Sequence, residues 1–237
     1  MPDIRDEIAD EPALRGPATP PASSGEDTDG IWGEPALSGT PAAAESRKRH
    51  DSWVAAQWKG ASAPMRTLAF IALALASGPF AVVCALLRET VGRGFIAIAV
   101  LAPVVEEAGK IAAPLTTLEK RPWLFSSGSS ITVLCTLSGL VFASIENLLY
   151  FFVYIKNPTP EIIAWRLVVC TAMHVVCSTL SGFGLARVWR SASLRRGNGS
   201  DSPNSPTDIP SLAAPWIVAA VFLHGLYNSS TVIWNLL

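Results

Sequence analysis

Residues 65–87 read MRTLAFIALALASGPFAVVCALL, an apolar stretch in which Arg66 is the only charged residue. A helix needs roughly 20 mostly apolar residues to cross the hydrocarbon core of a bilayer. Further stretches of sufficient length occupy residues 95–118, 131–155, 162–189 and 213–234. The sequence therefore predicts an all-α membrane protein, a polytopic bundle of about five transmembrane helices.

The composition supports this fold class. Of the 237 residues, 50% are hydrophobic and only 16% are charged, and the formal net charge is -1. This is a low proportion of charge for a soluble domain of this length. The cysteines Cys84, Cys135, Cys170 and Cys177 all lie within apolar stretches, which favours free thiols over a disulfide framework. We expect no nucleic-acid partner, and the oligomeric state is left open.

The N-terminal region differs from the rest of the chain. Residues 1–60 are rich in Ala, Pro, Gly, Ser and acidic residues and show no apolar period, which predicts a disordered, acidic cytosolic tail before a transmembrane domain at 61–237. The basic start and short apolar core of a cleavable signal peptide are missing. The first apolar stretch is therefore expected to direct insertion. Residues 197–210, rich in Ser, Asn, Gly and Pro, are expected to form a flexible cytosolic linker.

Basic residues near the ends of the predicted spans are unevenly distributed. One side of the membrane would carry Arg47, Lys48, Arg49, Lys59, Arg66, Lys120, Arg121, Arg187, Arg190, Arg195 and Arg196, and the other only Arg88, Arg93, Lys156 and Arg166. The positive-inside rule then predicts a multi-pass protein of the cell membrane with a cytosolic N-terminus and an external C-terminus. Arg166, near the outer end of the fourth span, is expected to be an interfacial anchor.

Every predicted span after the first carries side chains that do not suit a lipid-facing helix. They are Glu106, Glu107 and Lys110, then Glu146 and Asn147, then His174, and finally His224 and Asn228. Each charged side chain costs about 2.5 to 3.5 kcal/mol at a helix centre, so the three glutamates and the lysine together would cost on the order of 10 kcal/mol if unpaired. Because they lie near the middle of their spans, we expect them to meet in the bundle interior or in a water-filled cavity.

Local spacing supports an interacting cluster. Lys110 follows Glu106 by four residues and Glu107 by three, so its ammonium can neutralise a carboxylate of the previous turn. Asn228 follows His224 by four residues on the same face, where its amide could hold a substrate carbonyl or oxyanion. Pro103, one turn before Glu106, frees a backbone carbonyl and is expected to distort the helix beside the cavity.

Four segments in this order resemble the PrsW family of intramembrane proteases, which is related to the group that contains the CAAX prenyl proteases and bacteriocin-processing membrane proteins. They are APVVEEAGK at 102–110, FASIENLLY at 142–150, the segment around His174, and HGLYN at 224–228. The resemblance covers about residues 95–237. It implies a membrane-embedded active site that cleaves a membrane-protein substrate near or within its transmembrane segment. Better-known members act on anti-sigma factors, which raises that substrate class.

Amide hydrolysis needs an activated water, an oxyanion stabiliser and a proton donor. The candidate catalytic residues are Glu106, Glu107, Lys110, Glu146, His174, His224 and Asn228. In one version of the chemistry, Glu106 or Glu107 activates a water held by the two histidines. In the other, His174, His224 and Glu107 bind Zn²⁺ and a second glutamate moves the proton. The H-E-x-x-H zinc motif is missing, and the sequence leaves both versions open.

Other interpretations of the same residues remain open. Lys110 could snorkel to the interface, and Glu146 with Asn147 could be a structural interhelical hydrogen-bond pair. Buried Glu and His chains also form proton relays in transporters, but the internal repeats expected of a transporter are not evident. A non-catalytic membrane scaffold is a further alternative. The predicted spans contain no aspartate for an aspartyl dyad and no G-x-S-x-G-like element.

Overall fold

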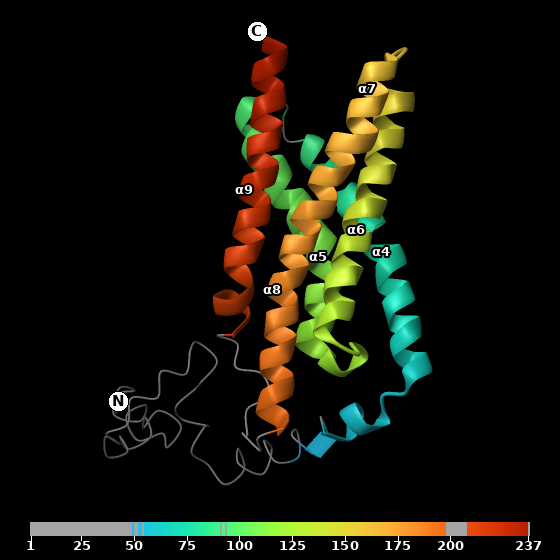
Figure 1. Cartoon of the computed structure of the whole chain (residues 1–237), viewed down its shortest axis with the longest axis vertical. Coiled ribbons are helices and arrows are strands. Elements are labelled where there is room, and N and C mark those ends of the chain that lie inside the picture. The colour runs from blue at the N-terminus through green and yellow to red at the C-terminus, as the bar shows by residue number, and fades with distance from the viewer. Residues whose placement is uncertain are drawn as a thin grey trace, which may run out of the picture. The chain divides into compact units, whose positions relative to one another are not determined.

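The computed structural model describes residues 49, 52–53, 55–90, 92, 94–197 and 208–236. Their regular structure is helical, as predicted (Figure 1). The long helices are α4 (Ala63–Glu89), α5 (Ala102–Lys120), α6 (Gly128–Leu149), α8 (Thr171–Gly197) and α9 (Asp208–Leu236). A short helix, α7 (Pro160–Trp165), leads into α8.

Among the described residues, four helical segments are long and apolar enough to cross a membrane: Ala63–Glu89, Gly128–Tyr154, Pro160–Ser191 and Ser211–Trp234. They correspond to four of the five predicted spans. The remaining one, residues 95–118, also forms a helix and lies among the others (Figure 1). It is more polar because Glu106, Glu107 and Lys110 lie on it, and all three are buried. The count of about five is consistent with this bundle.

In the part of the chain that the structure describes, three π-helical turns adjoin the helices that carry Glu106, Glu146 and His174. These turns are η1 (Ala97–Leu101), η3 (Tyr150–Tyr154) and η4 (Arg166–Cys170), and a 3-10 turn, η2 (Pro122–Leu124), follows α5. Pro103 has no N–H, so it cannot bond the carbonyl of Ala99 as a helical residue would. Next to it, the N–H of Ala102 bonds the carbonyl of Ala97, five positions earlier, which is the π-helical pattern. The distortion expected at Pro103 therefore takes the form of η1. Such turns often occur at functional sites.

Glycines allow the helices that carry the histidines to approach their neighbours closely. A Cβ on Gly139 of α6 would lie 2.5 Å from Oγ of Ser178 and 2.8 Å from the carbonyl oxygen of His174. A Cβ on Gly225 of α9 would lie 2.7 Å from the carbonyl oxygen of Ala99 in η1. Small residues are typical of close helix crossings in membranes, where packing rather than the hydrophobic effect drives association.

The largest apolar core lies toward the end of the bundle at which α5 ends and α9 begins. It consists of Ile111, Leu118, Phe125, Ile131, Leu134, Cys135, Leu185, Val188 and Ala213. The predicted tail and linker lie largely outside the described residues. In the part of the predicted tail that is described, residues 55–60 are helical. At the predicted linker, α8 ends at Gly197 and α9 begins at Asp208.

Candidate active site

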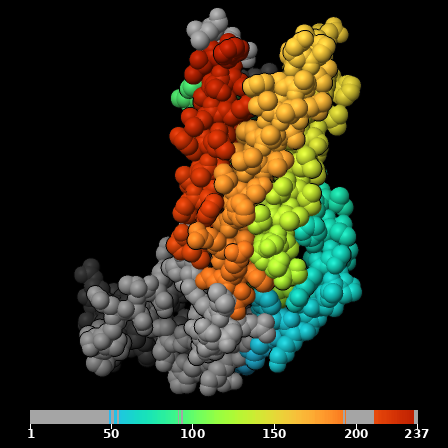
Figure 2. Space-filling model, in the orientation of Figure 1, coloured from blue at the N-terminus to red at the C-terminus, as the bar shows by residue number. Residues whose placement is uncertain are grey.

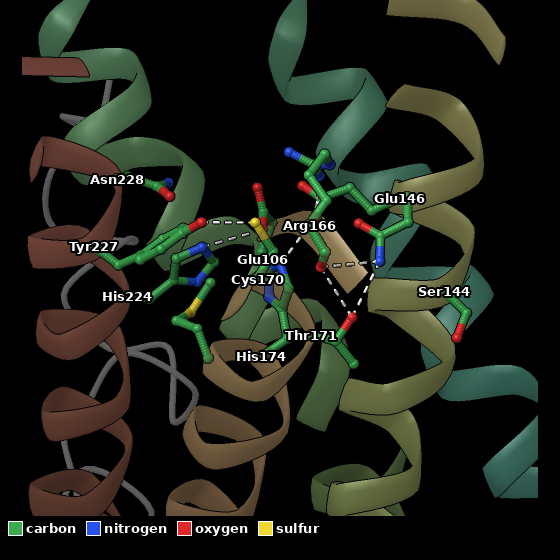
Figure 3. Close-up of polar contacts among 12 residues, drawn as sticks. Glu106, Ser144, Glu146, Arg166, Cys170, Thr171, His174, His224, Tyr227 and Asn228 are labelled. Atoms are coloured by element: carbon green, nitrogen blue, oxygen red, sulfur yellow. Dashed lines mark hydrogen bonds and ion pairs between the residues drawn. The ribbon is translucent and has the colours of Figure 1, made fainter. Parts of the chain in front are cut away.

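The two transmembrane histidines lie side by side, although 50 positions of sequence separate them. His174 on α8 is 2% exposed and His224 on α9 is 1% exposed. Their ring centroids are 4.9 Å apart and the rings are almost perpendicular, at 89°. Figure 3 shows both rings beside the carboxylate of Glu106, on α5. The predicted meeting of these helices at one site is therefore present in the structure.

Lys110 lies within this cluster instead of reaching the membrane surface. Its side chain is fully buried, and Nζ lies 2.7 Å from Oε1 of Glu107 and 2.9 Å from Nδ1 of His174. The ammonium also lies 4.3 Å from the centre of the Phe142 ring. The described position of Lys110 thus disagrees with the snorkelling alternative, because the paired carboxylate and the imidazole offer it partners inside the bundle.

Opposite partners on the two rings select opposite tautomers. Oε1 of Glu107 lies 2.8 Å from Nδ1 of His224, so His224 donates from Nδ1 and keeps a lone pair on Nε2. Nδ1 of His174 instead accepts from the Lys110 ammonium, so the proton of a neutral His174 is on Nε2. Oε2 of Glu146 lies 3.0 Å from that nitrogen and accepts its N–H.

Glu106 completes a group that could hold a metal ion. One donor atom each from Glu106, His174 and His224 lie within 4.8 Å of one another. Oε2 of Glu106 is buried without a hydrogen-bond partner among the described residues, and it lies 3.6 Å from Nε2 of His224. The carboxylate in this group is Glu106. In the predicted ligand Glu107, Oε1 contacts Lys110 and His224, and Oε2 is buried without a hydrogen-bond partner among the described residues.

The donor set fits a divalent transition metal. Two imidazoles and one carboxylate are an ordinary ligand set for catalytic zinc. The lone pair on Nε2 of His224 and the unpartnered oxygen of Glu106 are available without rearrangement. Lys110 occupies Nδ1 of His174, so an ion could bind that ring at Nε2 only after the proton that Nε2 donates to Glu146 has left this nitrogen.

The cluster lies at the closed end of a cavity of about 1060 Å³. All five long helices contribute to its lining. The lining residues lie between Val82 and Glu89 on α4, between Ile98 and Glu106 on η1 and α5, and between Phe142 and Tyr154 on α6 and η3. Others lie between Glu161 and His174 on α7, η4 and α8, and between His224 and Trp234 on α9. Apart from the residues of the cluster and Phe142, which lies beside Lys110, most of the lining lies toward the C-terminal end of α9. Figure 2 shows the surface notched between the upper parts of α9 and α7.

The other predicted site residues lie around this cavity. Asn228 lines it and donates from Nδ2 to the carbonyl oxygen of Ile98 at 3.1 Å. Glu146 lines it as well, whereas its neighbour Asn147 is buried and donates to Oγ1 of Thr171 at 3.1 Å. The two residues therefore differ in position: Asn147 joins α6 to α8, and Glu146 faces the cavity.

One residue of the site, Arg166, is missed by the sequence interpretation. It lines the cavity, and its Nη2 lies 3.0 Å from Oε2 of Glu146. Its position near a span end indicates an interfacial anchor, and only its spacing of eight residues before His174 hints at a shared helix face. The contact with Glu146 depends on how α6 and η4 pack, which the sequence of either segment does not specify.

These observations define a multi-pass membrane protein with a buried carboxylate and imidazole centre at the bottom of a cavity, an arrangement suited to hydrolysis. A family model described as PrsW family intramembrane metalloprotease matches residues 54–237. The chain therefore belongs to the PrsW family and is an intramembrane peptidase, as its sequence motifs predict. Comparison with curated proteins and comparison with solved structures each gave no match.

Proposed function

We propose that Glu106, His174 and His224 form the hydrolytic centre of this peptidase and hold its metal ion. The observation that carries the proposal is the convergence of one donor atom from each residue within 4.8 Å, at the closed end of the cavity. A bound divalent ion would polarise the scissile carbonyl and make its water a stronger nucleophile. Zn²⁺ is our candidate because of the donor set.

Glu146 is the candidate for proton transfer. Among the glutamates near the two histidines it is the one that both lines the cavity and hydrogen bonds an imidazole, with Oε2 3.0 Å from Nε2 of His174. A carboxylate at this place takes a proton from the attacking water and returns it to the leaving amine. Asn228, one helical turn after His224, is assigned to the substrate carbonyl through its second amide N–H.

Glu107 and Lys110 act on the two histidines and not on the substrate, since neither lines the cavity. Glu107 fixes the tautomer and orientation of His224, and Lys110 orients the ring of His174 through its contact with Nδ1. Lys110 also neutralises Glu107, which is fully buried. The two residues thus keep both imidazoles in place.

The position of the cavity indicates where the substrate is cleaved and from which side of the membrane it enters. Under the positive-inside topology the open side is the external one, so we assign the scissile bond to the outer half of a membrane-protein substrate. An anti-sigma factor is one candidate. A coupled transporter would need a path to both faces, and the apolar core beyond Ile111 and Leu134 occupies the other end of the bundle.

Cleavage of a membrane-protein reporter by the purified chain in liposomes tests the hydrolytic centre. We expect Glu106→Gln, His174→Ala and His224→Ala each to abolish cleavage while the protein stays folded. Glu119→Gln is the matched control, because Glu119 lies on the same helix but is exposed and outside the cavity. Normal cleavage by all three site variants would refute the proposal.

Comparative proteomics identifies the substrate class. Membrane fractions of cells carrying the wild-type chain or Glu106→Gln should differ in a few membrane proteins, each shortened near an outer membrane boundary in the wild type only. Shortening on the cytosolic side would contradict the assigned access route. Recovery of an anti-sigma factor among these proteins would support that candidate, and other membrane proteins in its place would exclude it.

A further inference from the structure

Arg166 forms an ion pair inside the wall of the cavity. Nη2 of Arg166 lies 3.0 Å from Oε2 of Glu146, and the two side chains are only 12% and 22% exposed. A carboxylate that is mostly buried is costly without a cation or hydrogen-bond donors. The position of Glu146 therefore depends on Arg166.

The paired oxygen also contacts a histidine of the site. Oε2 of Glu146 lies 3.0 Å from Nε2 of His174 as well as 3.0 Å from Nη2 of Arg166. A single atom thus connects the guanidinium to the imidazole. A change at Arg166 that moves this oxygen also changes the hydrogen bond of His174.

The guanidinium itself stacks on a ring of η3, directly after α6. Cζ of Arg166 lies 3.3 Å from the centre of the Tyr150 ring, and Tyr150 follows Glu146 by four residues. The backbone carbonyl of Arg166 accepts hydrogen bonds from Nδ2 of Asn147 at 3.4 Å and from Oγ1 of Thr171 at 3.3 Å. A planar guanidinium can stack on an aromatic ring and pair with a carboxylate at once, which a lysine ammonium does less well.

We propose that Arg166 is a positioning residue for the peptidase reaction, which holds the Glu146 carboxylate beside His174 at the wall of the cavity. It acts through Glu146 and His174 and does not contact the reacting atoms. For its effect on catalysis the inference rests on the proposed function. The contact itself can be tested independently of activity.

The kinetic test compares Arg166→Met with Arg166→Lys. Loss of an outer partner of this kind lowers activity by about 10-fold to 100-fold, so we expect Arg166→Met to lower kcat by that factor with little change in KM. Arg166→Lys restores the charge without the stacked fork and should recover part of kcat. Arg187→Met is the matched control, since Arg187 is an arginine of α8 that lies 5.7 Å over the Trp216 ring, outside the cavity.

The spectroscopic test uses the fact that the chain contains only three histidines, His50, His174 and His224. In protein labelled with ¹⁵N-histidine, the ring signals of His174 are assigned by their loss in His174→Gln. We expect the spectrum of the wild-type protein, stripped of metal for this comparison as all the variants are, to show a proton on Nε2 bonded to a carboxylate. Arg166→Met and Glu146→Gln should each shift this signal, and the double variant should shift it no further than Glu146→Gln does. Arg187→Met should leave it in place.

An unshifted His174 signal in Arg166→Met would overturn the proposal, whatever happens to activity, and so would a wild-type kcat in a variant whose signal has moved. If the signal shifts as expected but His174→Ala and His224→Ala still cleave, the hydrolytic centre is wrong and the Arg166 contact stands. Should Arg166→Met not fold, Arg166→Gln replaces it with the same expectations.

Discussion

Oε1 of Glu107 accepts a hydrogen bond from Nδ1 of His224 at 2.8 Å, in a fully buried position where the same oxygen is also 2.7 Å from the Lys110 ammonium. This contact leaves Nε2 of His224 as a lone-pair donor on the side of Glu106. The paired glutamates of residues 106–107 therefore have different positions. Glu106 faces the cavity, and Glu107 orients a histidine.

The first prediction concerns the different positions of Glu106 and Glu107. Glu107→Gln should lower both metal affinity and cleavage by about 10-fold to 100-fold, because an amide is a weaker acceptor for the Nδ1–H of His224. Glu106→Gln should remove metal and cleavage more completely, since it alters a proposed ligand. Metal titration of both variants in detergent, with Glu119→Gln as the control, measures the difference. Equal losses in the two variants would contradict distinct positions.

The second prediction concerns Lys110. Lys110→Met removes the cation from a fully buried pair and leaves the Glu107 carboxylate uncompensated, which costs about 3 to 5 kcal/mol in comparable buried pairs. We therefore expect a lower unfolding temperature as well as loss of cleavage. Thermal unfolding in detergent measures the first effect. Lys120→Met, on the exposed last turn of the same helix, should change neither, and a Lys110→Met protein as stable as wild type would argue for a snorkelling lysine.

A third prediction follows from the close helix crossings. A Cβ at Gly139 would lie 2.5 Å from Oγ of Ser178, and one at Gly225 would lie 2.7 Å from the carbonyl oxygen of Ala99, so Gly139→Ala and Gly225→Ala must displace helices that carry the histidines. Overpacking of this kind costs about 1 to 3 kcal/mol. Both variants should unfold at lower temperature and cleave more slowly. Gly60→Ala is the control, because its new Cβ would meet nothing within 4 Å beyond its own stretch of backbone.

A fourth prediction tests the side on which the cavity opens. In a background with the four native cysteines replaced, single cysteines at Ile98 and Ser230, which line the cavity, should react with a membrane-impermeant thiol reagent from the external side. A cysteine at Glu119, exposed at the other end of α5, should react from the cytosolic side. Labelling of intact cells and of inverted vesicles distinguishes the two. Labelling of Ile98→Cys from the cytosolic side would contradict both the topology and the access route.

Much of the fold is predictable from the sequence because the spans are long and apolar. The runs at 65–87 and 131–155 correspond closely to α4 and to α6 with η3. The π-helical turns are not predictable in this way, since they depend on how neighbouring helices pack. Pro103 provides a local signal for η1, but η3 and η4 have no comparable proline.

That these side chains gather inside the bundle is predictable because charged and polar side chains are rare at mid-membrane depth. Their pairing is not. Sequence spacing places Lys110 within reach of both Glu106 and Glu107, and only the approach of α8 and α9 determines that it pairs with Glu107 and His174. The same limit explains why Glu107 is the carboxylate expected in the metal group and Glu106 is the one found there. It also explains why Arg166 is expected to be an anchor.

Metal content is the most direct test of the central claim that Glu106, His174 and His224 form a metal-dependent hydrolytic centre. Elemental analysis of purified, active wild-type protein should find about one zinc ion per chain, as a single catalytic site requires. Glu106→Gln, folded to the same extent, should contain much less, and reporter cleavage by the wild type should stop on chelation and return with added Zn²⁺. Full cleavage after complete metal removal, or an unchanged metal content in Glu106→Gln, would contradict the account.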